Sequence, residues 1–388
     1  KLLLIALLIV GCVFANLLPD NFALSSLNRS SITLPSNSVV DIREGINGKL
    51  YFGTSGGLGY AEFDNSNPIF HTIISDSLPR GGNPATFTYD NILAISGVID
   101  TAGVSGNESA GTGISYADIN DNIWKYLAQP IDSIPTEGQY QTIEWRGQSL
   151  TALAVTTEIN NVSYDIAVND DYIYVASWAG GVKRYNYADE NPEWEIIPLP
   201  MDGQGSLYCG QIDIGNYQLN PHDPANGGNH NHKGFSVYVD EDTLWVGTAA
   251  GINKGILNGD CIDWVGHYTS RLQNISGNWV IGFTGQDYDG GNRIWAITWG
   301  ADSQGEFSAL SYTSDGGNTW ETTMPSGHPE KVYNLFADST HIWAASESGL
   351  YLSENGLHWE KYLRPIDSAS DKELLVESVM SVYYSSPF

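Results

Sequence analysis

The stretch that decides the fold is Leu50-Tyr51-Phe52-Gly53-Thr54, followed closely by Gly57-Leu58. Related stretches return along the chain, as Ile173–Ser177, Leu244–Thr248, Ile294–Thr298 and Ile342–Ser346. A phrase copied at intervals of about 40–70 residues indicates one supersecondary unit that is repeated many times. The repeat therefore describes how the chain is built more directly than what the chain does.

Each copy has the composition of a four-stranded antiparallel sheet. An apolar run such as Phe235–Val239 precedes the phrase, and a polar turn such as Asn47-Gly48 joins the two, which is typical of a β-hairpin. A third strand begins after the glycine, and an aromatic residue follows it at a constant distance. In three copies the aromatic residue comes 12 positions after the apolar residue that follows the glycine: Phe70 after Leu58, Trp194 after Val182 and Trp264 after Ile252. Four strands per copy predict one blade of a β-propeller.

The predicted fold is all-β, a single β-propeller over residues 16–388. Six blades are expected near residues 38–75, 86–130, 140–200, 233–268, 277–323 and 330–364. A seventh begins with Ser378–Tyr384, and we expect a strand from residues 22–34 to join it, because propellers commonly close by pairing their two ends. The last of seven blades is then incomplete. Since the chain begins at Lys1 and stops inside that unit, we expect a piece of a longer protein at both ends.

Charge excludes several classes of partner. Acidic residues number 45 against 17 lysines and arginines, so that the net charge is −28. Such a surface repels nucleic-acid phosphates and anionic lipid. We therefore expect no nucleic acid partner, and a soluble monomer with an acidic, solvated surface.

Residues 1–15 have the pattern of a secretory signal peptide. Lys1 precedes an apolar run too short to span a bilayer, and Val13-Phe14-Ala15 offers a cleavage site. The stretch Ile9-Val10-Gly11-Cys12 also resembles a bacterial lipobox, with a lipid on Cys12. We expect secretion, with lipid anchoring at Cys12 as the alternative, and no membrane span. The mature protein then lies in the periplasm, on the outer surface or outside the cell.

After cleavage at Ala15 two cysteines remain, Cys209 and Cys261. An oxidising compartment favours a disulfide between them, and two buried thiols are the alternative.

Two motifs carry a family resemblance that covers nearly the whole mature chain. Residues 34–42 and 48–54 resemble the repeats of two-component-regulator propellers. Thr313-Ser314-Asp315-Gly316-Gly317-Asn318-Thr319-Trp320 resembles the Asp-box (BNR repeat) of sialidase-like and sortilin-like propellers, and residues 352–359 are a weaker copy with Glu354 in place of the aspartate. The resemblance implies a structural turn between the outer two strands, formed by Thr313, Asp315, Gly317 and Trp320. It assigns no catalytic role to Asp315.

Catalytic patterns are weak. A sialidase needs an arginine cluster for the substrate carboxylate, whereas the eight arginines here are scattered. No catalytic residue is assigned. A glycanase with two carboxylates stays open, because acidic residues are abundant and their spacing in space is not readable from sequence.

Loop positions predict where a ligand binds. In a propeller the turn between the second and third strands shares a face with the connection between blades. Trp178 and Trp299 fall in such turns, and the long insertion at residues 201–233 belongs to the same face, as does a long turn at residues 100–111. The insertion contributes His222, Asp223, His230 and His232 as candidate ligand-binding residues.

Metal binding is an open alternative at two places. His222, His230 and His232 are candidate ligands of a transition metal, and a loop held by hydrogen bonds is the competing interpretation. Residues 287–292 suggest loosely bound Ca²⁺, but a hairpin turn accounts for them as well. We expect no cofactor.

The leading hypothesis is a secreted or cell-surface, non-enzymatic propeller that binds an extracellular protein or glycan through this face. The alternatives are a carbohydrate-active hydrolase of the Asp-box type and the extracytoplasmic sensor of a two-component system.

Overall fold

The computed structural model describes residues 33–64, 67–103, 106–121, 123–132, 138–159, 161–301, 305–362, 366–367, 372–373 and 378–384. The predicted signal peptide, Cys12 and all but the last two residues of the predicted strand at 22–34 lie outside the described residues.

Six four-stranded antiparallel sheets follow one another along the described chain, each with its strands in sequence order. Blade 1 is β1 (Val39–Glu44), β2 (Leu50–Thr54), β3 (Gly57–Asp64) and β4 (Asn67–Thr72); blade 2 is β5 (Thr86–Tyr89), β6 (Ile92–Gly103), β7 (Gly106–Asp118) and β8 (Ile123–Leu127). Blade 3 is β11 (Ser163–Val168), β12 (Tyr172–Ser177), β13 (Gly181–Asn186) and β14 (Trp194–Ile197); blade 4 is β16 (Gly234–Asp240), β17 (Thr243–Thr248), β18 (Gly251–Asn258) and β19 (Cys261–Tyr268). Blade 5 is β20 (Trp279–Tyr288), β21 (Gly291–Trp299), β22 (Ala309–Thr313) and β23 (Glu321–Thr323); blade 6 is β24 (Val332–Ala337), β25 (Ile342–Ser346), β26 (Gly349–Ser353) and β27 (Glu360–Lys361).

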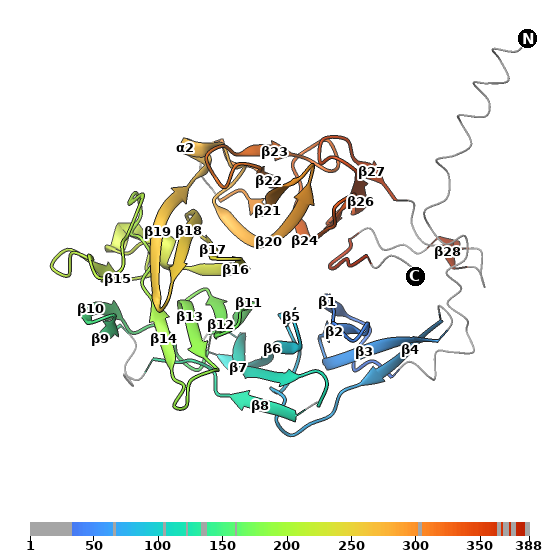
Figure 1. Ribbon diagram of the computed structural model, residues 1–388, viewed down its shortest axis with the longest axis horizontal. Coiled ribbons are helices and arrows are strands. Elements are labelled where there is room, and N and C mark those ends of the chain that lie inside the picture. Colours follow the sequence, from blue (N-terminus) through green and yellow to red (C-terminus); the bar gives the residue numbers. More distant parts are fainter. Residues whose placement is uncertain are drawn as a thin grey trace, which may run out of the picture.

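The blades stand radially in a ring, with their first strands around the centre (Figure 1). Each first strand contacts that of the next blade, from β1 through β5, β11, β16 and β20 to β24. In three blades a side chain of the first strand also accepts a hydrogen bond from a backbone N–H further round the ring. These inter-blade acceptors and their donors are Asp41 and Thr86 (3.1 Å), Asp165 and Val237 (3.0 Å), and Asn334 and Val382 (3.2 Å).

The last of these bonds locates the seventh blade. Val382 takes the place beside β24 that Thr86 takes beside β1, so residues 378–384 lie where a seventh first strand belongs. The Tyr383 hydroxyl then donates to Glu44 of β1 at 3.0 Å, which joins the end of the described chain to its beginning. The prediction of a seven-bladed propeller with an incomplete last blade is confirmed.

The repeated phrase forms the second strand of a blade, which is buried on both faces. Every residue of β12 and β17 is buried, as the near-continuous apolar runs require. Adjacent blades share clusters of apolar side chains; Trp245 of blade 4, for example, packs with Val280 and Trp320 of blade 5. A side chain at Gly247 would overlap the Val280 carbonyl oxygen, which explains the glycine inside the phrase.

Residues 140–153 correct the predicted limits of blade 3. They form a separate hairpin, β9 (Tyr140–Trp145) and β10 (Gln148–Leu153), extended by the short parallel strand β15 (Gln218–Leu219). The hairpin lies at the outer edge of the ring beside β14 (Figure 1). Blade 3 itself begins at Ser163.

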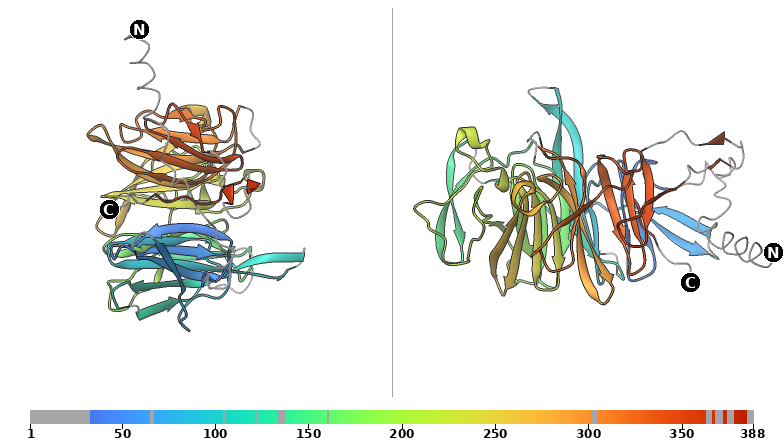
Figure 2. Two further views of the ribbon diagram at one scale, coloured as in Figure 1. Left: turned by 90° about the vertical axis from the view of Figure 1, so that its right-hand side faces the viewer. Right: turned by 90° about the horizontal axis from the view of Figure 1, so that it is seen from above.

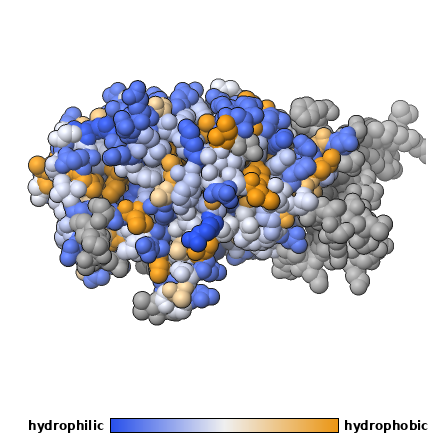
Figure 3. Space-filling model, turned by 90° about the horizontal axis from the view of Figure 1, so that it is seen from below, coloured by the Kyte–Doolittle hydropathy of each residue, from blue (hydrophilic) through white to orange (hydrophobic). Residues whose placement is uncertain are grey.

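The long turn predicted at residues 100–111 is also different in the structure. Strands β6 and β7 continue through it as a paired arm that projects from the ring (Figure 2). Figure 3 shows the same arm below an outer edge that is largely hydrophilic, with separate hydrophobic spots.

The remaining described elements are short: η1 (Pro224–Asn226), η2 (His230–His232), α2 (Ser270–Gln273), β28 (Ile366–Asp367) and β29 (Lys372–Glu373). No helix within the described ranges is long and apolar enough to cross a membrane.

Candidate binding face

Two tryptophan–lysine pairs recur on one face of the ring. Trp178 follows the second strand of blade 3, and Lys233, the residue before β16, lies over its ring at 4.9 Å from the centroid. Trp299 ends the second strand of blade 5, and Lys331, the residue before β24, lies over its ring at 4.8 Å. We call this side of the ring, which carries the turns after the second strands, the tryptophan face.

The equivalence of the two pairs extends to the backbone. The Lys233 carbonyl accepts from Ala249 N at 3.1 Å, and the Lys331 carbonyl accepts from Glu347 N at 3.0 Å. An ammonium group above an indole ring is a favourable electrostatic arrangement. Both indole rings are half-buried, and Lys331 is exposed.

Other aromatic side chains surround these pairs. Trp178 contacts Phe235 with ring centroids 5.1 Å apart and Trp279 at 6.1 Å, edge to face. Trp299 contacts Tyr333 at 5.9 Å and donates its indole N–H to the Val332 carbonyl at 2.8 Å. These contacts fix the orientation of both tryptophans and leave part of each ring accessible.

A repeated β-bulge explains why these aromatic residues lie there. In five blades the ladder between the first and second strands shifts near its start. The bulged residues are Val40, Tyr164, Phe235, Ile281 and Tyr333. A bulge turns a side chain away from the regular ladder, and here it brings apolar side chains to the tryptophan face. Tyr164 is an example, because 45% of it is exposed.

Sequence reasoning selected Trp178 and Trp299 but missed Lys233 and Lys331. A signal for the lysines exists: the pattern lysine, any residue, aromatic occurs as Lys233-Gly-Phe235 and as Lys331-Val-Tyr333. Both copies stand at the entrance to a first strand.

The candidate histidines do not converge. His232 is buried, accepts from Asn220 N at Nδ1 (2.9 Å) and lies 3.1 Å from the Leu199 carbonyl at Nε2. Burial lowers the pKa of His232 to about 4, so the ring is neutral and both nitrogens are engaged. His230 lies 3.5 Å from Asp223, and His222 is exposed.

This geometry does not support the metal hypothesis for His222, His230 and His232, which stays a prediction. The stretch from His230 to His232 is a 3-10 helix and not a strand, so alternate residues do not share a direction. In the part of the chain that the structure describes, no three His, Cys, Asp or Glu side chains form a group that could hold a metal ion.

The insertion at residues 201–233, called the strap below, also differs from its predicted place. It leaves the tryptophan face, pairs Leu207 with Trp264 of β19 and returns through β15. Leu207, Ile212, Tyr217 and Leu219 are buried in a core shared by blades 3 and 4. A disulfide joins Cys209 of the strap to Cys261. The strap therefore binds the outer edges of these blades together, and only its two ends reach the face.

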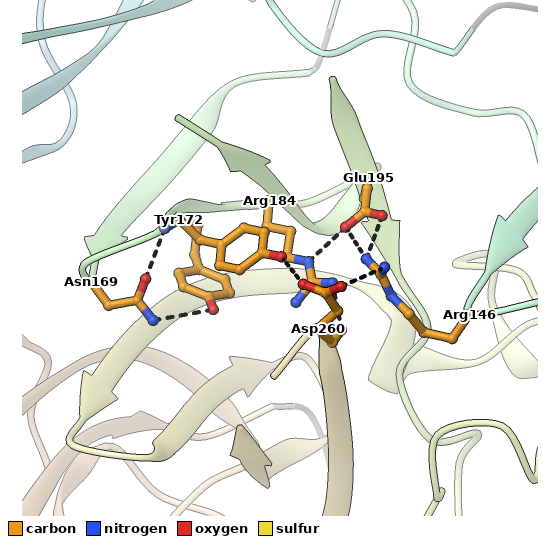
Figure 4. Close-up of polar contacts among 7 residues, drawn as sticks. Arg146, Asn169, Tyr172, Arg184, Glu195 and Asp260 are labelled. Carbon is orange, nitrogen blue, oxygen red and sulfur yellow. Dashed lines mark hydrogen bonds and ion pairs between the residues drawn. The ribbon is translucent and has the colours of Figure 1, made fainter. Parts of the chain in front are cut away.

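Charged side chains gather at the outer edge of blades 3 and 4 (Figure 4). Arg184 is 1% exposed on its side chain and donates to Glu195 at 2.8 Å, and Arg146 from the β9–β10 turn donates to the same carboxylate at 2.6 Å. The Tyr172 hydroxyl donates to Asp260 at 2.7 Å. Burial and the Asp260 carboxylate raise the pKa of Tyr172 to about 12, so it remains a donor. The cluster joins the β9–β10 hairpin, blade 3 and the β18–β19 turn of blade 4. Within it, Nε of Arg146 and Nη1 of Arg184 are buried without a hydrogen-bond partner.

Two carboxylates near the centre of the ring are the nearest approach to a catalytic acid pair. Asp41 and Asp165 are inter-blade acceptors, and burial raises the pKa of Asp165 to about 7, with Asp41 as a further contribution. Each also accepts from the N–H of the residue that follows it. Because Asn334 makes the same bond without a charge, the position serves blade-to-blade contact.

The turn at residues 313–320 has the expected geometry between β22 and β23. Asp315 accepts from Thr319 N at 2.9 Å, and Thr313 Oγ1 accepts from Gly317 N at 2.8 Å. In the weaker copy Asn355, and not Glu354, accepts from the following N–H groups, at 2.8 and 3.0 Å. The turn is structural; the Asp-box type of the repeat remains a prediction.

Comparisons with known proteins agree on architecture only. No family model matches the chain, and no curated protein does. A GH74 enzyme of Niastella koreensis matches 85% of this chain over 46% of its own, with a TM-score of 0.50 and 14% identity. The propeller domain of Cps50 (Swd1) from Myceliophteria thermophila matches 86% of this chain over 87% of its own length, with a TM-score of 0.49 and 10% sequence identity. The extracellular domain assigned to a hybrid two-component system of B. thetaiotaomicron matches 85% of this chain over 46% of its own length, with a TM-score of 0.31 and 14% sequence identity. At such identities the likeness concerns the fold alone: the chain is a β-propeller.

Proposed function

We propose that this chain is a secreted or cell-surface, non-enzymatic propeller that binds an extracellular glycan or protein at the tryptophan face. The observation that carries the proposal is the repetition of one Trp–Lys pair at equivalent positions of two alternate blades. Packing alone does not require a lysine at each position, since the other blades close the same turn without one.

The chemistry of the pairs indicates the first ligand to test. A half-exposed indole ring stacks on the apolar face of a sugar, and an ammonium group contacts a carboxylate. The chain has a net charge of −28, so two positively charged side chains on one face differ from the acidic character of the rest of the molecule. A glycan that carries carboxylate groups combines both requirements.

The experiment is a titration of the protein with oligogalacturonate, followed by calorimetry. Lys233→Met and Lys331→Met together should weaken binding about tenfold or more, because each removes a charged contact. Lys125→Met, on the outer strand β8, is the matched control, since Lys125 also lies over an aromatic ring, that of Tyr116 at 5.4 Å.

Two results would reject the proposal. One is binding that the paired lysine substitutions leave unchanged. The other is no interaction with oligogalacturonate or with any member of a panel of acidic glycans and acidic peptides.

The hydrolase alternative has less support. It needs a pair of carboxylates free to reach a substrate. Asp41 and Asp165 are both occupied by backbone N–H groups, as described above.

A further inference from the structure

A cavity of about 1000 Å³ lies at the outer edge of the ring, and neither tryptophan–lysine pair lines it. Its walls are β9, β14 and the chain from Tyr126, near the end of β8, to Asp132. Arg146, Glu195 and Asp260 of the charge cluster (Figure 4) are among its lining residues. Nothing in the proposed function uses this cavity.

One wall is the unpaired edge of a strand. In the described sheet β15–β10–β9, strand β9 pairs with β10 on one side only. Its hydrogen-bonding pattern follows from the turn. Arg146 and Gly147 both have positive φ, at 47° and 78°, as a two-residue hairpin requires, so the flanking Trp145–Gln148 pair is hydrogen-bonded.

The pattern then alternates along the ladder. Pairs with odd-numbered β9 residues are hydrogen-bonded, as the bond from Ala154 N to the Gln139 carbonyl (2.8 Å) independently shows just before the strand. The N–H and C=O groups of Thr142 and Glu144 therefore point away from β10. Both residues line the cavity.

The side chains around the cavity favour a particular occupant. Ile131 is 46% exposed and Tyr126 is 49% exposed, and Ile143 and Trp194 are half-buried among the lining residues. These groups offer apolar contact to alternate side chains of an added strand.

The charge of the cavity is acidic. Arg146 is paired with Glu195, and Lys183 lies 3.7 Å from Asp132. Glu144, Asp189 and Glu193 line the cavity as well, and no ion pair to them occurs among the described residues. Positive side chains of a ligand would meet these three carboxylates.

We propose that this cavity binds an extended peptide segment of another protein, rich in lysine or arginine, which adds as a strand to the free edge of β9. Backbone N–H and C=O groups of Thr142 and Glu144 supply the main-chain bonds. Apolar side chains of the peptide lie against Ile143 and Trp194, and its cations face Glu144 and Glu193. The six residues of β9 match a segment of about six residues, the ordinary length of a strand.

The test uses two synthetic probes, acetyl-Thr-Lys-Val-Lys-Val-Lys-Thr-amide and its counterpart with glutamate for lysine. Binding is followed by calorimetry, and amide hydrogen exchange reports the location. We expect the lysine peptide to bind and to slow exchange at Thr142 and Glu144. The glutamate peptide should not bind.

Substitutions separate strand addition from general attraction to an acidic protein. Thr142→Pro removes an N–H that β10 does not use and should weaken binding about tenfold or more, whereas Thr142→Ala should not. Glu144→Gln with Glu193→Gln should weaken binding severalfold. Glu347→Gln with Glu354→Gln, on exposed positions of blade 6, is the charge-matched control and should have no comparable effect.

Several outcomes would overturn the proposal. They are equal binding of the two peptides, binding that Thr142→Pro leaves unchanged, and equal effects of the two glutamine pairs. If Thr142→Pro does not fold, judged by its thermal midpoint, the glutamine pairs and the exchange pattern decide.

Discussion

The outer edge between blades 3 and 4 and the tryptophan face use their polar groups in opposite ways. At the outer edge Arg184 is buried and held by Glu195, and a disulfide fastens the strap over the blades. On the tryptophan face Lys233 and Lys331 lie over indole rings, and neither forms an ion pair in the described structure. The long insertion thus serves stability, whereas short turns present the accessible groups.

Of the substitutions that test this contrast, removal of the disulfide should have the largest effect on the free energy of unfolding. Cys209 and Cys261 are 52 residues apart, and a closed loop of that length stabilises a fold by about 4 kcal/mol in the chain-entropy model. Cys209→Ser with Cys261→Ser should lower the free energy of unfolding by a similar amount, measured by urea denaturation. Reduction of the disulfide in the wild-type protein should lower the free energy of unfolding by the same amount as the double substitution. An unchanged urea midpoint would show that the strap holds without its cross-link.

The next effect should come from the buried guanidinium group. Arg184→Met leaves Glu195 with one partner fewer and removes the donor to the Asp260 carbonyl. Because Glu195 is one-third exposed and keeps Arg146, the loss should be about 2 kcal/mol, the size of a charged hydrogen bond. Urea unfolding of this variant should show that loss, and equal stability of Arg184→Met and wild type would mean that packing and not charge holds the edge.

A third test compares two inter-blade acceptors at the centre of the ring, one charged and one neutral. The pKa of Asp165 is raised by burial from 3.8 to about 7, so folding favours its protonated form. Stability from this group is complete below the ordinary pKa and is lost as the pH rises through about 7. The loss is roughly 1–2 kcal/mol, since Asp165 is not fully enclosed.

Asp165→Asn imitates Asn334 and should remove that pH dependence. Thermal midpoints of wild type and variant, measured across this pH range, check the prediction. Parallel pH profiles for the two proteins would contradict it.

The smallest effect is expected on the tryptophan face. Lys233→Met and Lys331→Met should each change the free energy of unfolding by less than about 1 kcal/mol, the size of a partly exposed cation–π contact. Differential scanning calorimetry is sufficient to measure this. A loss as large as that of Arg184→Met would show that the lysines are structural, and would remove the main support for the binding face.

Much of the fold was predictable because it depends on local patterns. The phrase at residues 244–248 predicted a second strand, and β17 covers Thr243–Thr248. The blade limits failed at residues 140–153, because a hairpin with strand composition looks like part of a blade until its partner is known. That partner is β15, from the strap.

The candidate site was predictable only in part. Trp178 and Trp299 stood in turns whose place follows from blade order, and they lie on one face. His222, His230 and His232 were close in sequence, but a turn of 3-10 helix and the burial of His232 separated their roles. The lysine above each tryptophan precedes the next blade along the chain. The pattern lysine, any residue, aromatic marks both lysines, but no local pattern shows that each lies over a tryptophan.

Periodicity by itself determined that this chain forms a ring of radial sheets, since strand length, turn chemistry and buried runs are properties of neighbours in sequence. Tertiary structure alone decided which groups face solvent. The strap, the disulfide and the cavity beside β9 arise from contacts between segments tens of residues apart, and burial and pKa depend on the whole surroundings of a side chain.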